Sequence, residues 1–160
     1  MRRPRDVDLF VAVAIGGVIG ALARHGVDLL FPTETDEWPL ATFIINLTGA
    51  FILGVVLEAA IAFAPDPAAN PLARRMRPFL ITGVLGGYTT FSTYMVEAHG
   101  LVTSDRAPLA LLYVFGSLVA GVICVVLGMK VGRALFHRDD EPADLVARED
   151  TDIRFLEDEA

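Results

Sequence analysis

Charged side chains are almost missing from four long stretches of this 160-residue chain. The stretches run from about Leu9 to Phe31, Pro39 to Ala64, Pro78 to Val102 and Pro108 to Leu135. Each exceeds the roughly 20 residues that a helix needs to cross the hydrocarbon core of a membrane. Because 54% of the residues are hydrophobic, too few polar residues remain to cover four buried helices in a soluble domain. The sequence therefore predicts an all-α integral membrane protein with four transmembrane helices.

The chain also lacks the residue patterns of disulfides, metal centres and nucleotide sites. Cys124 is the single cysteine, which excludes an intrachain disulfide. The three histidines lie on different segments, and no cysteine or carboxylate is spaced to complete a transition-metal site with them. No Gly-Lys-Ser or Gly-Lys-Thr motif follows the glycines of the third stretch, and no catalytic constellation is present. We therefore expect neither an enzyme nor an ATP-driven pump, and no nucleic-acid partner.

Acidic residues are concentrated at the C-terminus. Residues 139–160 hold ten acids and two bases, a net charge of −8, whereas the whole chain has a net charge of −7. Residues 1–138 therefore carry a net charge of about +1 and form the predicted transmembrane domain. We expect the acidic segment to be a solvated, largely disordered tail. A short helix in this tail could use its apolar residues Leu145, Ile153, Phe155 and Leu156.

Arginines near the predicted membrane boundaries favour one orientation. Four spans place both termini and the connection between the second and third spans on the same side. The arginines near the membrane on that side are Arg2, Arg3, Arg5, Arg74, Arg75, Arg77, Arg133 and Arg138. The opposite side has Arg106, and Arg24 lies within the first span. This excess predicts a protein of the cell membrane with both termini in the cytoplasm.

Polar side chains within the spans indicate a pathway or a partner, because they are costly in hydrocarbon. Asn46 lies in the first third of the second span, and Glu97 lies in the third. Arg24 could equally reach the interface with its long side chain. Small residues four apart recur in every span and favour close helix packing, as in Gly16/Gly20, Ala50/Gly54, Gly83/Gly87, Gly116/Ala120 and Ser117/Gly121.

The third stretch contains residues that are poorly suited to a helix. From Gly83 to Tyr94 it reads GVLGGYTTFSTY, with glycines followed by β-branched threonines. Unwound backbone at membrane depth is tolerated only where it is buried in protein or lines a cavity. Its free carbonyls and the adjoining helix ends can bind ions. We therefore expect a broken helix at an ion site, in preference to a flexible packing notch.

This stretch resembles the third-helix signature of the Fluc (CrcB) family of fluoride channels, over the string from Gly86 to Tyr94. The resemblance extends over about residues 9–135 in the same order. Its other matches are the Gly-rich first helix from Gly16 to His25, the Asn-containing second helix from Thr42 to Phe51, and the polar fourth-helix residues Tyr113 and Ser117.

The resemblance implies passive fluoride export, which lowers the toxicity of fluoride in the cytoplasm. It also implies an antiparallel dimer in the lipid bilayer with two pores, whose second subunit is a copy of this chain or a paralogue of opposite orientation. A central structural Na⁺ would be held by the backbone carbonyls of Gly86 and Thr89. Phe91 would meet fluoride, oriented by Asn46. The remaining pathway candidates are Tyr94, Ser92, Thr93, Glu97, Tyr113 and Ser117, with Arg24 in a vestibule.

Two residues depart from the family's pattern, and two other functions stay open. Tyr94 stands where the family usually has a second phenylalanine, and Gly121 stands where it often has another hydroxyl. A proton-coupled small multidrug transporter is also a four-helix dimer. It needs a carboxylate deep in its first helix, however, and this chain has no acid between Leu9 and Ala23. A membrane scaffold subunit explains the small residues but not the polar ones.

Overall fold

A computed structural model describes residues 4–34, 37–63 and 70–136, and every regular element within these ranges is helical. The predicted all-α fold is therefore confirmed. The acidic tail at 139–160 lies outside the described residues, as do Arg2, Arg3 and Arg138. In chain order, the elements are α1 (Pro4–Leu30), α2 (Leu40–Phe63), α3 (Pro71–Arg77), η1 (Pro78–Leu85), α4 (Gly86–Tyr88), α5 (Ser92–Thr103) and α6 (Ala107–Phe136).

Three of the described helices are long and apolar enough to cross a membrane: Val7–Leu30, Leu40–Phe63 and Ala107–Phe136. Large apolar side chains such as Leu22 and Leu112 are exposed on these helices. Water would contact these side chains in a soluble monomer, whereas lipid tails are as apolar as the side chains themselves. The chain is therefore a multi-pass membrane protein.

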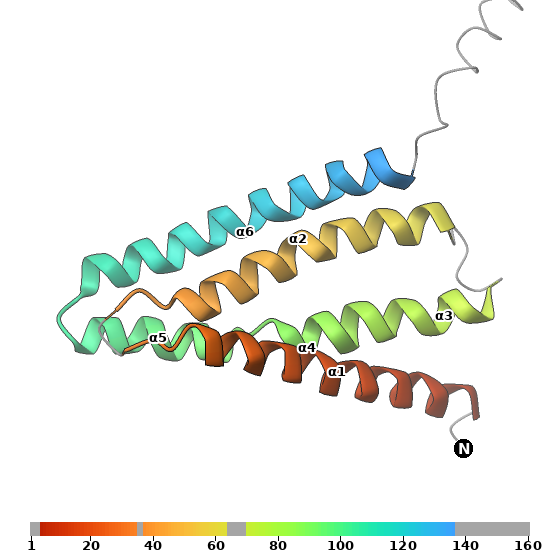
Figure 1. Ribbon diagram of the computed structural model, residues 1–160, viewed down its shortest axis with the longest axis horizontal. Helices are drawn as coiled ribbons and strands as arrows, with labels where there is room; N and C mark the ends of the chain where they lie inside the picture. The colour runs from red at the N-terminus through yellow and green to blue at the C-terminus, as the bar shows by residue number, and fades with distance from the viewer. Residues whose placement is uncertain (1–3, 35–36, 64–69, 137–160) are drawn as a thin grey trace, which may run out of the picture.

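The helices run side by side along the long axis of the molecule (Figure 1). α1 leads away from the N-terminus, and α2 returns beside α6. The segment from α3 to α5 then runs alongside α1, and α6 returns. The start of α1, the start of α3 and the end of α6 therefore lie at one end of the molecule, called here the terminal end. The connections from α1 to α2 and from α5 to α6 lie at the opposite end, called here the loop end.

Glycines allow two pairs of helices to approach closely. α1 packs against η1 and α4, where a Cβ atom on Gly16 would lie 3.0 Å from the Cα atom of Gly83. α2 packs against α6, where a Cβ atom on Gly54 would lie 2.7 Å from the backbone nitrogen of Met129. Any larger side chain at these positions would push the backbones apart. The predicted packing through small residues is confirmed at both contacts.

The third predicted span is a chain of shorter helices with a break over residues 89–91. η1 is π-helical, α4 ends at Tyr88, and Thr89 is extended with φ −75° and ψ 157°. The predicted break is therefore present, and it lies after the glycines. Gly83 and Gly87 lie within helices and contact the backbone of α1, so the close approach of α1 is what requires them.

Candidate functional site

Asn46 on α2 bridges the break in the third helix. Its Nδ2 donates a hydrogen bond to the carbonyl oxygen of Thr90 (3.0 Å), and its Oδ1 accepts one from the backbone N–H of Thr90 (3.0 Å). An interrupted helix leaves such backbone groups unpaired, which is costly away from water. One amide side chain satisfies both groups, and one Nδ2 hydrogen remains for another acceptor.

Thr90 also caps the first turn of α5. Its Oγ1 accepts a hydrogen bond from the backbone N–H of Thr93 (3.2 Å) and donates one to the Thr93 hydroxyl (3.0 Å). The hydroxyl of Ser92 lies 3.3 Å from the same Oγ1. The predicted pathway residues Ser92 and Thr93 therefore bond to Thr90. The start of α5, where the helix dipole places partial positive charge, lies at the break.

A groove of about 290 Å³ lies beside the break and is called here the break groove. Ser117 on α6 is part of its wall. The Oγ of Ser117 is buried and has no hydrogen-bond partner among the described residues, so it can still donate to a ligand. The structure thus gathers four of the eight predicted pathway residues in one place. The lining consists of Asn46, Thr89, Thr90, Phe91, Tyr94, Ser117 and Leu118.

The two aromatic residues of the break groove have different surroundings. The ring centroids of Phe91 and Tyr94 lie 6.0 Å apart. Phe91 is 74% exposed, whereas Tyr94 is half-buried with its ring centroid 5.0 Å from that of Tyr113. The Tyr94 hydroxyl donates to the backbone carbonyl of Val114 on α6 (2.6 Å). The extra hydroxyl of Tyr94 is therefore bonded to α6, while Tyr94 itself still lines the groove.

A second polar cluster lies on the loop-end side of the break groove. The two carboxylate oxygens of Glu97 accept hydrogen bonds from the hydroxyls of Thr42 (2.8 Å) and Tyr113 (2.9 Å). The cluster joins α2, α5 and α6. Sequence reasoning singled out Glu97 and Tyr113 but missed Thr42. Thr42 lies four residues before Asn46, a spacing that puts both on one face of α2 and could have revealed it.

The carbonyls expected to hold Na⁺ lie on both sides of the point where the helix ends, at Gly86 in α4 and at Thr89 in the break. Because α4 ends at Tyr88, the carbonyl of Gly86 belongs to a helix end, where no following turn supplies donors. The backbone N–H and the hydroxyl of Thr89 both donate to the carbonyl of Leu85 (2.9 Å each). Carbonyl oxygens at a broken helix are suitable ligands for Na⁺. Two of them do not complete a coordination shell, so the chemistry of the donor set fits a site shared with a second subunit.

Arg24 lies apart from these clusters. It is half-buried on α1 and makes no hydrogen bond or ion pair with any residue of the described ranges. α1 packs mainly against η1 and α4, whereas the break groove is lined by α2, α5, α6 and the break itself. The vestibule expected at Arg24 stays a prediction.

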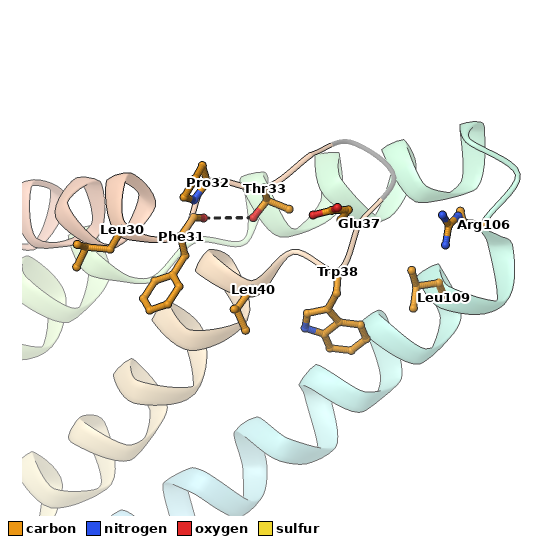
Figure 2. Close-up of a pocket in the computed structure, with 9 residues that line it drawn as sticks. All are labelled: Leu30, Phe31, Pro32, Thr33, Glu37, Trp38, Leu40, Arg106 and Leu109. Carbon is orange, nitrogen blue, oxygen red and sulfur yellow. Dashed lines mark hydrogen bonds between the residues drawn. The ribbon is translucent and has the colours of Figure 1, made fainter.

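A larger cavity of about 690 Å³ lies at the loop end (Figure 2). It is bounded by the chain around Trp38 and by the start of α6, including Arg106. Trp38 packs edge-on against Phe43 and Tyr113, with ring centroids 5.3 and 5.4 Å apart. None of the predicted pathway residues lines this cavity, so we regard it as separate from the break groove.

Comparison with known families places the chain in one group. The family model described as "CrcB-like protein, Camphor Resistance (CrcB)" matches residues 11–129. The matched range contains Asn46, the break and the fourth-helix residue Ser117. The match therefore covers every element that lines the break groove.

Several similar curated proteins share the name fluoride-specific ion channel. The chain is 39% identical over 130 residues to "Fluoride-specific ion channel FluC 3" of Streptomyces avermitilis, which is 81% of this chain but only 61% of that protein. It is 38% identical over 127 residues to "Fluoride-specific ion channel FluC" of Paracoccus denitrificans, covering 96% of that protein. A Hydrogenobaculum protein of the same name is 39% identical over 126 residues, with 98% of its length covered.

Proposed function

The chain belongs to the CrcB-like protein family, and from this membership and the geometry of the break we infer that it is a fluoride-specific ion channel. It is not an enzyme, and it conducts fluoride passively, driven by concentration and membrane potential. Hydrogen fluoride is a weak acid that enters from acidic surroundings and releases fluoride inside. A passive path out of the cell lowers the cytoplasmic concentration of this toxic ion.

The break groove is the observation that carries this inference. Fluoride is small and strongly hydrated, so a pore must replace its water with hydrogen-bond donors. Asn46 retains one Nδ2 hydrogen and Ser117 retains its hydroxyl, both at the groove. The electropositive ring edge of Phe91 and the N-terminal end of α5 add attraction for an anion. The groove therefore supplies donors and partial positive charge, and none of the described lysine or arginine side chains, which would hold the ion too tightly, lines it.

We propose that the chain crosses the membrane four times, with the segment from α3 to α5 as the third crossing. Each of the other crossings is one continuous helix. The third runs from the terminal end to the loop end in pieces, with the break between α4 and α5 (Figure 1). Interrupted helices near the membrane midplane are common where transport proteins bind ions. Asn46 and Thr90 pair the backbone there, which makes the break tolerable at that depth.

Arginine placement supports a cytoplasmic location for the terminal end. Among the described residues, Arg74, Arg75, Arg77 and Arg133 lie on α3 and near the end of α6, at the terminal end. Arg106 lies at the loop end. Because arginines and lysines in short connections are retained in the cytoplasm, the terminal end is the cytoplasmic one.

A second subunit completes the pore in this proposal. The break groove is open on one side, where Phe91 is largely exposed. Gly121 on α6 has no atom within 4 Å of an added Cβ, so α6 presents small residues to a partner. An antiparallel dimer would bring the Gly86 and Thr89 carbonyls of both chains around a structural Na⁺. Since the arginine bias fixes this chain in one orientation, we favour a partner of opposite bias over a homodimer inserted both ways.

Efflux from liposomes separates this function from the other two. We expect liposomes containing the protein, with its partner if one is required, to release fluoride while they retain chloride and a cationic dye. A small multidrug transporter would move the dye in exchange for protons, and a scaffold subunit would move none of the three. Dye transport, or no fluoride release from a folded and correctly paired protein, would rule out the fluoride channel.

A further inference from the structure

A second groove lies at the terminal end, away from the break. It has a volume of about 270 Å³, lies between the last turns of α2 and the segment formed by α3 and η1, and is called here the α2–α3 groove. Arg77 and Asn70 are its polar lining residues. The rest of the lining is apolar and includes Val56, Ala60, Phe63, Leu72, Met76 and Leu80.

Part of the α2–α3 groove lies on the water side of the membrane boundary. Arg74, Arg75 and Arg77 mark the level of the lipid head groups, because charged side chains are costly in hydrocarbon. Leu72 precedes these arginines by two to five residues, which places it about 3 to 7.5 Å nearer the terminal end at a rise of about 1.5 Å per residue. Leu72 is 67% exposed and Phe63 is 70% exposed. Lipid tails do not cover apolar side chains at that level, so another occupant is needed.

The C-terminal tail begins beside this groove. Phe63, which lines the groove, packs edge-on against Phe136, the last residue of α6, with ring centroids 5.3 Å apart. Another 24 residues follow Phe136 in the sequence. An extended chain covers up to about 3.3 Å per residue, so Phe155 can reach every part of the groove. The tail is tethered at this position, which gives it a high effective concentration compared with a free ligand.

The composition of the tail complements the groove and its surroundings. Residues 139–160 carry a net charge of −8, and α3 places three arginines in its last turn. Arg75 already pairs with Asp8 of α1 (2.8 Å), which shows that α3 accepts carboxylates at this end. The apolar pair Phe155 and Leu156 is followed directly by three acids, Glu157, Asp158 and Glu159. A segment of this kind can fill an apolar groove while its carboxylates meet the arginines.

We propose that the acidic tail docks on the α2–α3 groove of its own subunit, with Phe155 and Leu156 in the groove and the neighbouring acids against the arginines of α3. The groove is formed by α2, which also carries Asn46, and by α3 and the start of η1, the segment that leads to the break. Docking therefore ties the tail to α2 and to the first part of the third span. This inference does not depend on fluoride conduction, because the contact can be measured in the chain itself.

Disulfide cross-linking in the full-length chain tests the proposal. Cys124→Ser removes the only cysteine. Arg154→Cys, which keeps Phe155 and Leu156, is then combined with Met76→Cys in the groove or, as a matched control, with Val7→Cys on α1. Val7 belongs to the first turn of α1 and Met76 to α3, and both side chains are exposed, but only Met76 lines the groove. The two variants are oxidised under the same mild conditions in phosphatidylcholine vesicles.

We expect the groove pair to form its disulfide about tenfold more than the control pair, the ratio that a docking free energy of about 1.4 kcal/mol produces. Replacing Glu157, Asp158 and Glu159 by Gln, Asn and Gln should shrink this excess. Salt at about 1 M should do the same, because it shortens the Debye length to about 3 Å. Equal disulfide yields from the two cysteine pairs would overturn the proposal. Lipid or a second subunit would then be the occupant of the groove. An excess that neither charge treatment changes would overturn the electrostatic part of the contact.

Discussion

Among single residues, Asn46 combines an observed role with a proposed one. Its Oδ1 and one Nδ2 hydrogen pair the backbone of Thr90, which keeps the break tolerable at membrane depth. Its second Nδ2 hydrogen remains for an anion in the break groove. Substitution of Asn46 would disturb both roles at once. Substitutions of Phe91 and Tyr94 distinguish effects on conduction from effects on folding more clearly, because the two side chains differ in their contacts with the rest of the chain.

Phe91→Ile should lower fluoride flux by about tenfold or more, a ratio that corresponds to a barrier increase of about 1.4 kcal/mol. Isoleucine keeps the bulk and apolar character of the side chain but removes the electropositive ring edge. Because Phe91 is largely exposed in the single chain, the fold should not depend on it. Flux through proteoliposomes measures the effect, with size-exclusion chromatography as the control for assembly. Unchanged flux would mean that the ring only packs.

Tyr94→Phe should leave fluoride flux within about twofold of the unsubstituted protein, a barrier change of less than about 0.5 kcal/mol. The Tyr94 hydroxyl bonds to the carbonyl of Val114 on α6, so its loss removes a link between helices and leaves the ring in the groove. We expect stability to fall by about 1 kcal/mol, the usual net value of such a bond. Thermal unfolding and flux are measured on the same preparation. A large drop in flux without a change in stability would show that the hydroxyl itself meets fluoride.

The structure brings Asn46, Phe91, Tyr94 and Ser117 together at one groove, whereas their roles in fluoride conduction stay predictions. The family resemblance named these residues but not their bonding partners. The partner of Asn46 could not be foreseen, because the backbone of Thr90 becomes available only where the helix ends. Hydrogen bonds between positions that are far apart in the sequence depend on how the helices pack, and this packing cannot be read from a single sequence.

At the scale of elements, the third span shows where local propensity is overruled. The glycines are part of the pattern that predicts a broken helix, because glycine is a poor helix former. In the structure, Gly83 and Gly87 stay helical because α1 packs directly on their backbone, and that contact offsets the propensity. The break lies instead at residues 89–91, where Asn46 supplies the missing hydrogen bonds. Propensity therefore predicted that this span is interrupted, and tertiary contacts decided where.

The contact between α2 and α6 gives a matched pair of substitutions. An added Cβ on Gly128 would lie 3.0 Å from the carbonyl carbon of Phe51 and 3.2 Å from the Cα of Gly54, whereas one on Gly121 meets no atom within 4 Å. Gly128→Ala should therefore destabilise the bundle by about 1–3 kcal/mol through overpacking, and Gly121→Ala should not destabilise the single chain. Thermal unfolding in detergent compares the two. Equal unfolding temperatures would contradict the close approach of α2 and α6.

For the whole molecule, the arginine bias predicts one orientation. Reporters that are active only in the cytoplasm or only outside it, fused to the C-terminus, should give signal in the cytoplasm alone when the chain is expressed by itself. The proposed heterodimer depends on this result, because a chain fixed in one orientation cannot pair antiparallel with its own copy. Comparable signals from both compartments would favour the homodimer inserted both ways.

Selectivity for fluoride over chloride is the central property of a fluoride-specific channel. The reversal potential across a planar bilayer measures it most directly. With a tenfold gradient of fluoride and an opposite tenfold gradient of chloride, a channel that conducts fluoride alone should reverse at about 59 mV in magnitude, with the sign set by fluoride. We expect this value because the hydrogen-bond donors of the break groove and the ring edge of Phe91 favour fluoride. A reversal potential near zero would show that chloride passes equally well, and would contradict the assignment of this protein as a fluoride-specific channel.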